Sequence, residues 1–183
     1  MGAFQSCAPR ILPHRTDPRV SRAAATYQLQ LYAAKNNDLE WLLRSLSCHN
    51  PIDVRDPYAD TALHHAAVRG YTSACAIILR TEPAIVHAIN KGNNTALHLA
   101  CSTCKLDTVR LLLDAGAEVN ARGIEQFTPL HYACRDGKEH EDATAVVRLL
   151  LDRGACPTSP CYPWGLKAIH RIRPSCFADP PAV

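Results

Sequence analysis

Apolar residues recur at helical spacing in several short stretches of the chain. Leu63 and Ala66 lie three residues apart and share a helix face, and with Ile77 and Ile78 of the apolar run at residues 76–79 they are expected to form one inner face. Similar apolar runs (RLLL) occupy residues 110–113 and 148–151. Each run is too short to fold alone, so the pattern predicts pairs of short helices that pack against neighbouring pairs.

A sequence signature precedes each apolar run at a nearly constant period. Residues 61–67 (TALHHAA), 95–101 (TALHLAC) and 128–134 (TPLHYAC) align at offsets of 34 and 33 residues. A weaker copy lies upstream at residues 31–43, and another lies downstream at residues 164–170, where no second helix follows. The three full copies reach the minimum of about three that a stable stack requires.

These residues resemble the ankyrin repeat family, in which a turn precedes two antiparallel helices. The T-x-L-H-x-A signature occurs three times, and L-L-x-x-G-A follows two of its copies. The resemblance implies an all-α solenoid of helix-turn-helix units with β-turn fingers over residues 23–173, about four repeats plus a truncated fifth. Residues 1–22 are then a flexible N-terminal tail and residues 174–183 a Pro-rich C-terminal tail. The resemblance also implies that the recurring histidines bond to neighbouring backbone and join adjacent repeats: His64, His98, His131 and His170.

The repeats depart from the family pattern at their turns. The signature threonines can cap the first helices, and four glycines fall where helices end: Gly70, Gly116, Gly137 and Gly154. The family's turn glycine is replaced by Ala59, Asn93 and Gln126. Asn tolerates a positive φ better than Ala or Gln, so we expect the turns at Ala59 and Gln126 to be strained or reshaped. The third full repeat also carries about five extra residues at 137–142, predicted to form a solvated loop, with a partner contact as the alternative.

The composition excludes several classes of protein. Aromatic residues make up only 6% of 183 residues, which favours thin layers filled by small side chains. A net charge of +3 is too small to indicate nucleic-acid binding. No run approaches 18 apolar residues, and three prolines interrupt the first twenty residues, so we expect neither a transmembrane helix nor a secretory signal. We therefore predict a cytoplasmic chain with reduced thiols.

Nine Cys and nine His raise the question of a metal or redox site. Cys101 and Cys104 form a lone C-x-x-C, but no second ligand pair stands at zinc-finger spacing. We interpret Cys101 and Cys134 as buried replacements of the signature alanine, and Cys104 as a replacement of the helix-end glycine. His64 and His65 are adjacent and point in different directions, so they are weak evidence for a metal. We predict no metal and no cofactor, with zinc or redox use as a third alternative.

No nucleophile elbow, phosphate loop or paired-carboxylate motif is present, so we predict no enzymatic activity and no small-molecule substrate. The resemblance instead implies a concave groove, made by the fingers and the outer side of each first helix, that binds a partner protein. A rigid groove of this kind loses little conformational entropy on binding. Tyr, Phe and Arg commonly anchor interfaces. Carried over position by position, the groove candidates are Tyr58, Asp60, His65, Arg69, Lys91, Asn94, Leu99, Ser102, Ile124, Glu125, Phe127, Tyr132 and Arg135. Tyr58, Arg69, Phe127, Tyr132 and Arg135 form the most persuasive set, because they are expected to project onto one face.

The first residues (MGAFQS) fit the pattern for N-myristoylation at Gly2, with Cys7 as a nearby acceptor for palmitate. One myristoyl chain binds membranes marginally, so a second signal is needed. Acylation would tether the binding module to a membrane surface. A mitochondrial presequence is the rival interpretation, and the prolines, which break helices, disfavour it.

Two further alternatives concern the whole protein. Residues 169–173 begin a repeat that lacks its second helix, although a polar capping repeat is expected at the end of a solenoid. The chain could therefore be a fragment of a larger ankyrin-repeat regulator, or a substrate-recognition subunit of a ubiquitin ligase. No SOCS-box-like segment follows, which disfavours the ligase.

Overall fold

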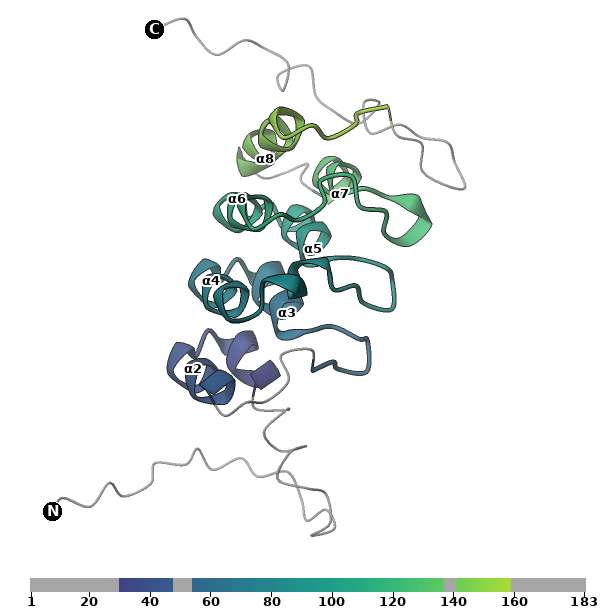
Figure 1. Cartoon of the computed structure of the whole chain (residues 1–183). Coiled ribbons are helices and arrows are strands. Elements are labelled where there is room, and N and C mark those ends of the chain that lie inside the picture. Colours follow the sequence, from purple (N-terminus) through teal and green to yellow (C-terminus); the bar gives the residue numbers. More distant parts are fainter. Residues whose placement is uncertain (1–29, 48–53, 137–140, 159–183) are drawn as a thin grey trace, which may run out of the picture.

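The structure is a computed structural model that describes residues 30–47, 54–136 and 141–158. Its helices form a stack of layers, each made of two antiparallel helices, with extended loops projecting from one side (Figure 1). This arrangement confirms the all-α repeat solenoid. Gly2, Cys7, residues 137–140 of the predicted loop and the copy at residues 164–170 lie outside the described residues. The boundaries of the two tails stay predictions.

Four layers follow one another along the stack. The first pairs a helix over residues 30–36 with α2, so the weak upstream copy is a helix pair as predicted. The remaining layers are α3 with α4, α5 with α6, and α7 with α8, and short 3-10 helices lie between them. The bounds are α2 Leu39–Ser47, α3 Ala62–Arg69, α4 Thr72–Thr81, η1 Pro83–His87, α5 Ala96–Ser102, α6 Leu106–Asp114, η2 Ile124–Gln126, α7 Pro129–Asp136 and α8 Glu141–Asp152.

A threonine and a histidine begin the inner helices α3 and α5. The Thr61 N–H donates to His64 Nδ1 at 3.2 Å, and the Thr61 hydroxyl lies 2.8 Å from the same nitrogen. Thr95 and His98 repeat this arrangement at 3.0 and 2.9 Å. Both threonines have extended backbone angles, which is the conformation of a helix N-cap. Because Nδ1 accepts from the backbone, the ring proton lies on Nε2, where it can reach the next layer.

Left-handed residues end the helices. Gly70, Gly116 and Gly154 have φ of 77°, 88° and 86°. Cys104 follows α5 with a φ of 53°, so it does take the helix-end glycine position, as predicted. A residue with a side chain is strained in this conformation. Cys104 is nevertheless only 3% exposed, and its side chain contributes to the core.

The core is thin because each layer contributes small side chains at fixed positions. Leu63, Leu97 and Leu130 are fully buried at the same position of successive repeats. Cys101 and Cys134 are buried between inner helices, where their small size lets α3, α5 and α7 pack side by side, as predicted. Among the described residues, no helix has the length and apolar character needed to cross a bilayer.

Candidate functional site

Three loops project beside the inner helices, and we call them fingers: finger 1 is residues 54–60, finger 2 is residues 88–94 and finger 3 is residues 121–127 (Figure 1). We call the surface made by these fingers and by the exposed sides of helix 30–36, α3, α5 and α7 the finger face. All thirteen groove candidates predicted from the sequence lie on these fingers and inner helices.

A carboxylate or amide side chain folds each of the first two fingers. Asp56 Oδ1 accepts hydrogen bonds from the N–H groups of Tyr58 at 2.8 Å and Asp60 at 2.9 Å. Asn90 Oδ1 accepts from the N–H groups of Gly92 and Asn94 at 2.9 and 3.0 Å. Such side-chain-to-backbone bonds stabilise tight turns. They hold Ala59 at a φ of 60°, which confirms the strain expected there.

Finger 3 has a different shape because Gly123 occupies the place of Asp56 and Asn90. The Gly123 N–H still donates to the Phe127 carbonyl at 2.8 Å, as the Asp56 and Asn90 N–H groups do to the Asp60 and Asn94 carbonyls, but no side-chain acceptor holds the turn between them. Two consecutive residues, Glu125 and Gln126, then have φ of 54° and 62°. The predicted reshaping at Gln126 is confirmed, and it leaves Ile124 49% exposed at the tip.

Side chains also join neighbouring fingers to one another. Asp60 Oδ1 accepts a hydrogen bond from Asn90 Nδ2 at 2.8 Å, and the Lys91 N–H donates to the Tyr58 carbonyl at 2.9 Å. Asn94 Oδ1 accepts the Tyr132 hydroxyl at 2.9 Å. Asp60 and Asn94 therefore hold the stack together, a role that the sequence did not indicate for these two groove candidates.

The repeat histidines link each inner helix to the following finger. His64 Nε2 lies 3.0 Å from the Asn94 carbonyl, and His98 Nε2 lies 3.1 Å from the carbonyls of Ala121 and Phe127. Burial lowers the pKa of His98 to about 4, although the two carbonyls favour the charged ring. The predicted structural role is confirmed for His64 and His98, whereas His170 lies outside the described residues.

Phe127, Tyr132 and Arg135 form a cluster at the end of the finger face. The Arg135 guanidinium lies 4.9 Å from the Tyr132 ring centre and 5.6 Å from that of Phe127, within cation–π range. The structure brings these three predicted residues together. However, Tyr132 is only 6% exposed, so the expectation of an exposed tyrosine is wrong. Its ring packs against the His98 ring on one side and contacts the Arg135 guanidinium.

The remaining candidates differ in exposure. Tyr58 is 71% exposed, and Arg69, Lys91, Glu125 and Arg135 are also exposed. Three others are half-buried on α3 and α5: His65, Leu99 and Ser102. The Ser102 hydroxyl donates to the Leu99 carbonyl at 2.8 Å, within its own helix.

Asp56, Asp60 and His65 bring their ligand atoms within 4.8 Å of one another at the base of finger 1. The sequence analysis did not identify Asp56 as a candidate. The signal that could have indicated it is its repeat position, which is equivalent to that of Asn90. Burial opposes ionisation of Asp56, but bonds from the N–H groups of Asp60 and Tyr58 and from His65 lower its pKa overall. Burial and the Lys35 charge lower the pKa of His65. The Asp56 carboxylate lies 3.0 Å from the neutral His65 imidazole. This contact and the turn hydrogen bonds explain the cluster as a structural part of finger 1.

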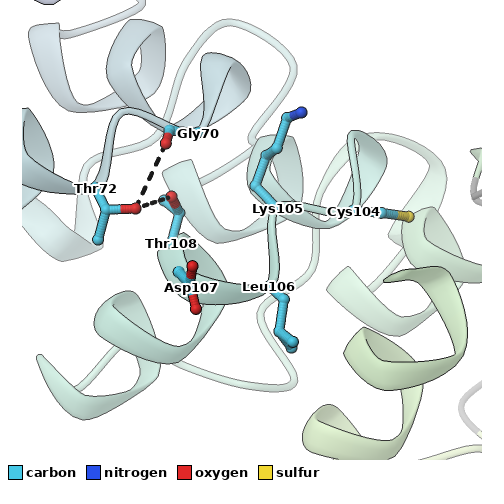
Figure 2. Close-up of a pocket in the computed structure, with 7 residues that line it drawn as sticks. All are labelled: Gly70, Thr72, Cys104, Lys105, Leu106, Asp107 and Thr108. Carbon is cyan, nitrogen blue, oxygen red and sulfur yellow. Dashed lines mark hydrogen bonds between the residues drawn. The ribbon is translucent and has the colours of Figure 1, made fainter. Parts of the chain in front are cut away.

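A cavity of about 230 Å3 lies where the α3–α4 turn meets the α5–α6 turn (Figure 2). The Thr72 hydroxyl lies 3.1 Å from the Thr108 hydroxyl and 3.4 Å from the Gly70 carbonyl. The carbon chain of Lys105 covers Gly70 so closely that a Cβ there would meet it. The cavity contains none of the groove candidates, and its two threonines bond to each other.

Comparisons with known proteins agree with the geometry. Residues 31–123 match a family described as ankyrin repeats in three copies, and residues 97–151 match one described as ankyrin repeats in many copies. "Ankyrin repeat domain-containing protein 53" of Homo sapiens is 30% identical over 141 residues, which cover 69% of this chain and 26% of the relative. "Ankyrin repeat and SOCS box protein 11" of Danio rerio is 42% identical over 98 residues, which cover 53% of this chain and 31% of the relative. "Ankyrin repeat and SOCS box protein 16" of Mus musculus is 34% identical over 105 residues, which cover 53% of this chain and 22% of the relative. The chain thus spans less than a third of the length of each of these relatives.

Proposed function

Because the chain belongs to the ankyrin repeat family, whose repeats bind other proteins, we propose that it is a non-catalytic scaffold that holds a partner protein on the finger face. Members of this family are generally interaction modules rather than enzymes. The partner rests against side chains that the stack itself does not need.

The exposed apolar side chains at the fingertips carry this proposal. Tyr58 on finger 1 is 71% exposed and Ile124 on finger 3 is 49% exposed, although each costs free energy when left in water. Both are positioned by strained turns, at Ala59 and at Glu125 with Gln126. Strained backbone persists where the surrounding structure imposes it and is common at binding sites. Aromatic and Arg side chains, as in the Phe127, Tyr132 and Arg135 cluster, are frequent anchors of interfaces.

Affinity purification with mass spectrometry tests the proposal. We expect the Tyr58→Ala/Ile124→Ala variant to lose partners that the wild type retains, with an unchanged circular dichroism spectrum. The matched control is Trp41→Ala/Leu43→Ala, which removes two large side chains, 39% and 46% exposed, from α2 instead. Equal retention of the partners by the finger variant, or their loss in the α2 variant, contradicts the choice of the finger face.

Membrane tethering is a separate part of the proposal. The MGAFQS start supports N-myristoylation at Gly2, and Cys7 supports a second acyl chain. We expect Gly2→Ala to move the protein from the membrane fraction to the soluble fraction, and Cys7→Ala to weaken membrane binding less completely. If Gly2→Ala leaves the partitioning unchanged, acylation at Gly2 does not anchor the chain.

The relatives named for a SOCS box favour a second candidate function, that of a substrate-recognition subunit of a ubiquitin ligase. In that case, co-expression should raise ubiquitin conjugation of the captured partner, and the Tyr58→Ala/Ile124→Ala variant should not. An unchanged level of conjugation contradicts the ligase function and leaves the scaffold function standing.

A further inference from the structure

The elements of the finger face carry a net positive formal charge, because they hold few carboxylates. Helix 30–36, the three fingers and the three inner helices carry six cations against four carboxylates, Asp56, Asp60, Glu125 and Asp136. The other described segments carry six cations against nine carboxylates. The six cations of the finger face are Lys35, Arg55, Arg69, Lys91, Arg122 and Arg135. Within the described residues, the elements of the finger face therefore carry a net positive formal charge and the remaining segments a net negative one.

The two carboxylates of finger 1 do not pair with the cations of the finger face. Asp56 accepts hydrogen bonds from turn N–H groups and contacts His65, and Asp60 accepts one from Asn90, so both carboxylates already have partners in the fingers and on α3. Glu125 is exposed at finger 3. Within the described part of the chain, four cations of the finger face form no ion pair, although Arg69 donates to the His65 carbonyl at 3.4 Å and Arg122 to Gln126 Oε1 at 3.0 Å. We call them the open cations: Lys35, Arg69, Lys91 and Arg122.

The open cations are distributed one to a layer. Lys35 lies on helix 30–36 and Arg69 on α3, while Lys91 and Arg122 lie on the fingers that lead into α5 and α7. Packed helices lie about 8–10 Å apart, and an extended peptide advances about 3.3 Å per residue. A strand that crosses the layers therefore advances by one layer about every third residue, and each layer carries one open cation.

We propose that the finger face binds an extended acidic segment of a partner protein. Carboxylates at about every third residue of that segment meet the open cations, and apolar side chains between them pack against Tyr58 and Ile124. This inference rests on the proposed scaffold function and adds the chemistry of the partner. Complementary charge steers association and selects the partner, while the apolar contacts supply most of the affinity.

Fluorescence anisotropy with the full chain and three labelled peptides tests the inference. The probes are four copies of Glu-Thr-Val, the neutral Gln-Thr-Val counterpart and the basic Lys-Thr-Val counterpart, because β-branched residues favour an extended peptide. We expect the acidic peptide to bind about tenfold more tightly than the neutral one at low salt, with the difference shrinking as salt rises. Equal binding of the acidic and neutral peptides would overturn the inference.

Charge reversal locates the binding surface. Arg69→Glu/Lys91→Glu should weaken binding of the acidic peptide about tenfold. The control Arg80→Glu/Arg110→Glu makes the same change in net charge at exposed positions of α4 and α6 and should alter binding by less than about twofold. An equal loss in both variants overturns the inference, because it would mean that only net charge matters. Tighter binding of a single-stranded RNA that is lost in the same finger-face variant also overturns it, in favour of nucleic acid.

The natural partner distinguishes this inference from the scaffold proposal. If Arg69→Glu/Lys91→Glu and Tyr58→Ala/Ile124→Ala both lose the partner captured by the wild type, both ideas are supported. If only the apolar variant loses it, the scaffold function stands and the acidic segment is wrong. If neither loses it, both are wrong.

Discussion

The Tyr132 hydroxyl donates a hydrogen bond to Asn94 Oδ1 at 2.9 Å, joining inner helix α7 to the finger of the preceding layer. The same oxygen lies 3.4 Å from the Ile124 N–H, so one side chain connects three segments. Both residues were groove candidates from their repeat positions. The structure gives them a role in the geometry of the finger face, because they fix where Ile124 and Arg135 stand.

Removing this hydroxyl should lower stability without removing the ring. We expect Tyr132→Phe to reduce the free energy of unfolding by about 1 kcal/mol, the usual net value of one hydrogen bond, while its ring still supports Arg135. Urea denaturation measures the change. Tyr58→Phe, at a 71% exposed tyrosine, is the control and should change stability by less than about 0.5 kcal/mol. Equal effects of the two substitutions would show that the Asn94 bond contributes nothing.

Relief of backbone strain should stabilise finger 1. Ala59 has a φ of 60°, where a side chain costs about 1–2 kcal/mol, so Ala59→Gly should raise stability despite the larger entropy of the unfolded glycine. We expect a gain of about 0.5 kcal/mol in thermal or urea unfolding. The same change at exposed Ala76 inside α4 should instead cost about 1 kcal/mol. If both substitutions destabilise equally, the left-handed turn is not a source of strain.

Stability should fall in mild acid because of the buried histidines. The pKa of His98 is lowered by burial to about 4, whereas an unfolded histidine has a pKa of about 6.5. Between these values the unfolded chain binds a proton that the folded chain does not. The contribution is therefore complete above pH 6.5 and is lost as pH falls towards 4, with a slope of up to about 1.4 kcal/mol per pH unit.

Urea unfolding at several pH values between 7.5 and 4.5 measures this slope, and burial lowers the pKa of His64 in the same direction. A His98→Gln variant should be less stable at pH 7.5 but should show a shallower dependence on pH. An unchanged slope in that variant would mean that His98 titrates normally in the folded chain.

Thiol reactivity should follow burial. Burial raises the pKa of Cys75 to about 12 and raises that of Cys101 well above its ordinary value, so neither supplies thiolate near neutral pH. Iodoacetamide at pH 8 should modify exposed Cys156 before buried Cys75 and Cys101, as followed by mass spectrometry. Cys75 and Cys101 should react at the same rate as Cys156 only in guanidinium. Fast native labelling of Cys101 would instead support the redox alternative.

The fold could be predicted because the sequence repeats. The threonine caps and the helix-end position of Cys104 follow from short-range rules that act identically in every repeat, so the alignment of three signatures predicted them. The histidine links join residues of adjacent repeats, and they were predicted from the family resemblance. The exposure of Tyr132 was mispredicted because its repeat position is half-buried at His65 and Leu99. Of these three equivalent residues, Tyr132 is the one with a hydroxyl, which bonds to Asn94 of the preceding finger. Its burial therefore depends on a contact with the neighbouring layer.

The sequence by itself thus determined the solenoid, its helix ends and the turns that would be strained, since these depend on residues within one repeat of each other. Only the tertiary structure decided which groove candidates form hydrogen bonds between layers and which remain exposed. It also showed that Gly123 reshapes finger 3 and that four cations stand open across the layers. Those outcomes arise from contacts between side chains of neighbouring repeats, about 30 or more residues apart in sequence, and a linear pattern does not specify which of them meet.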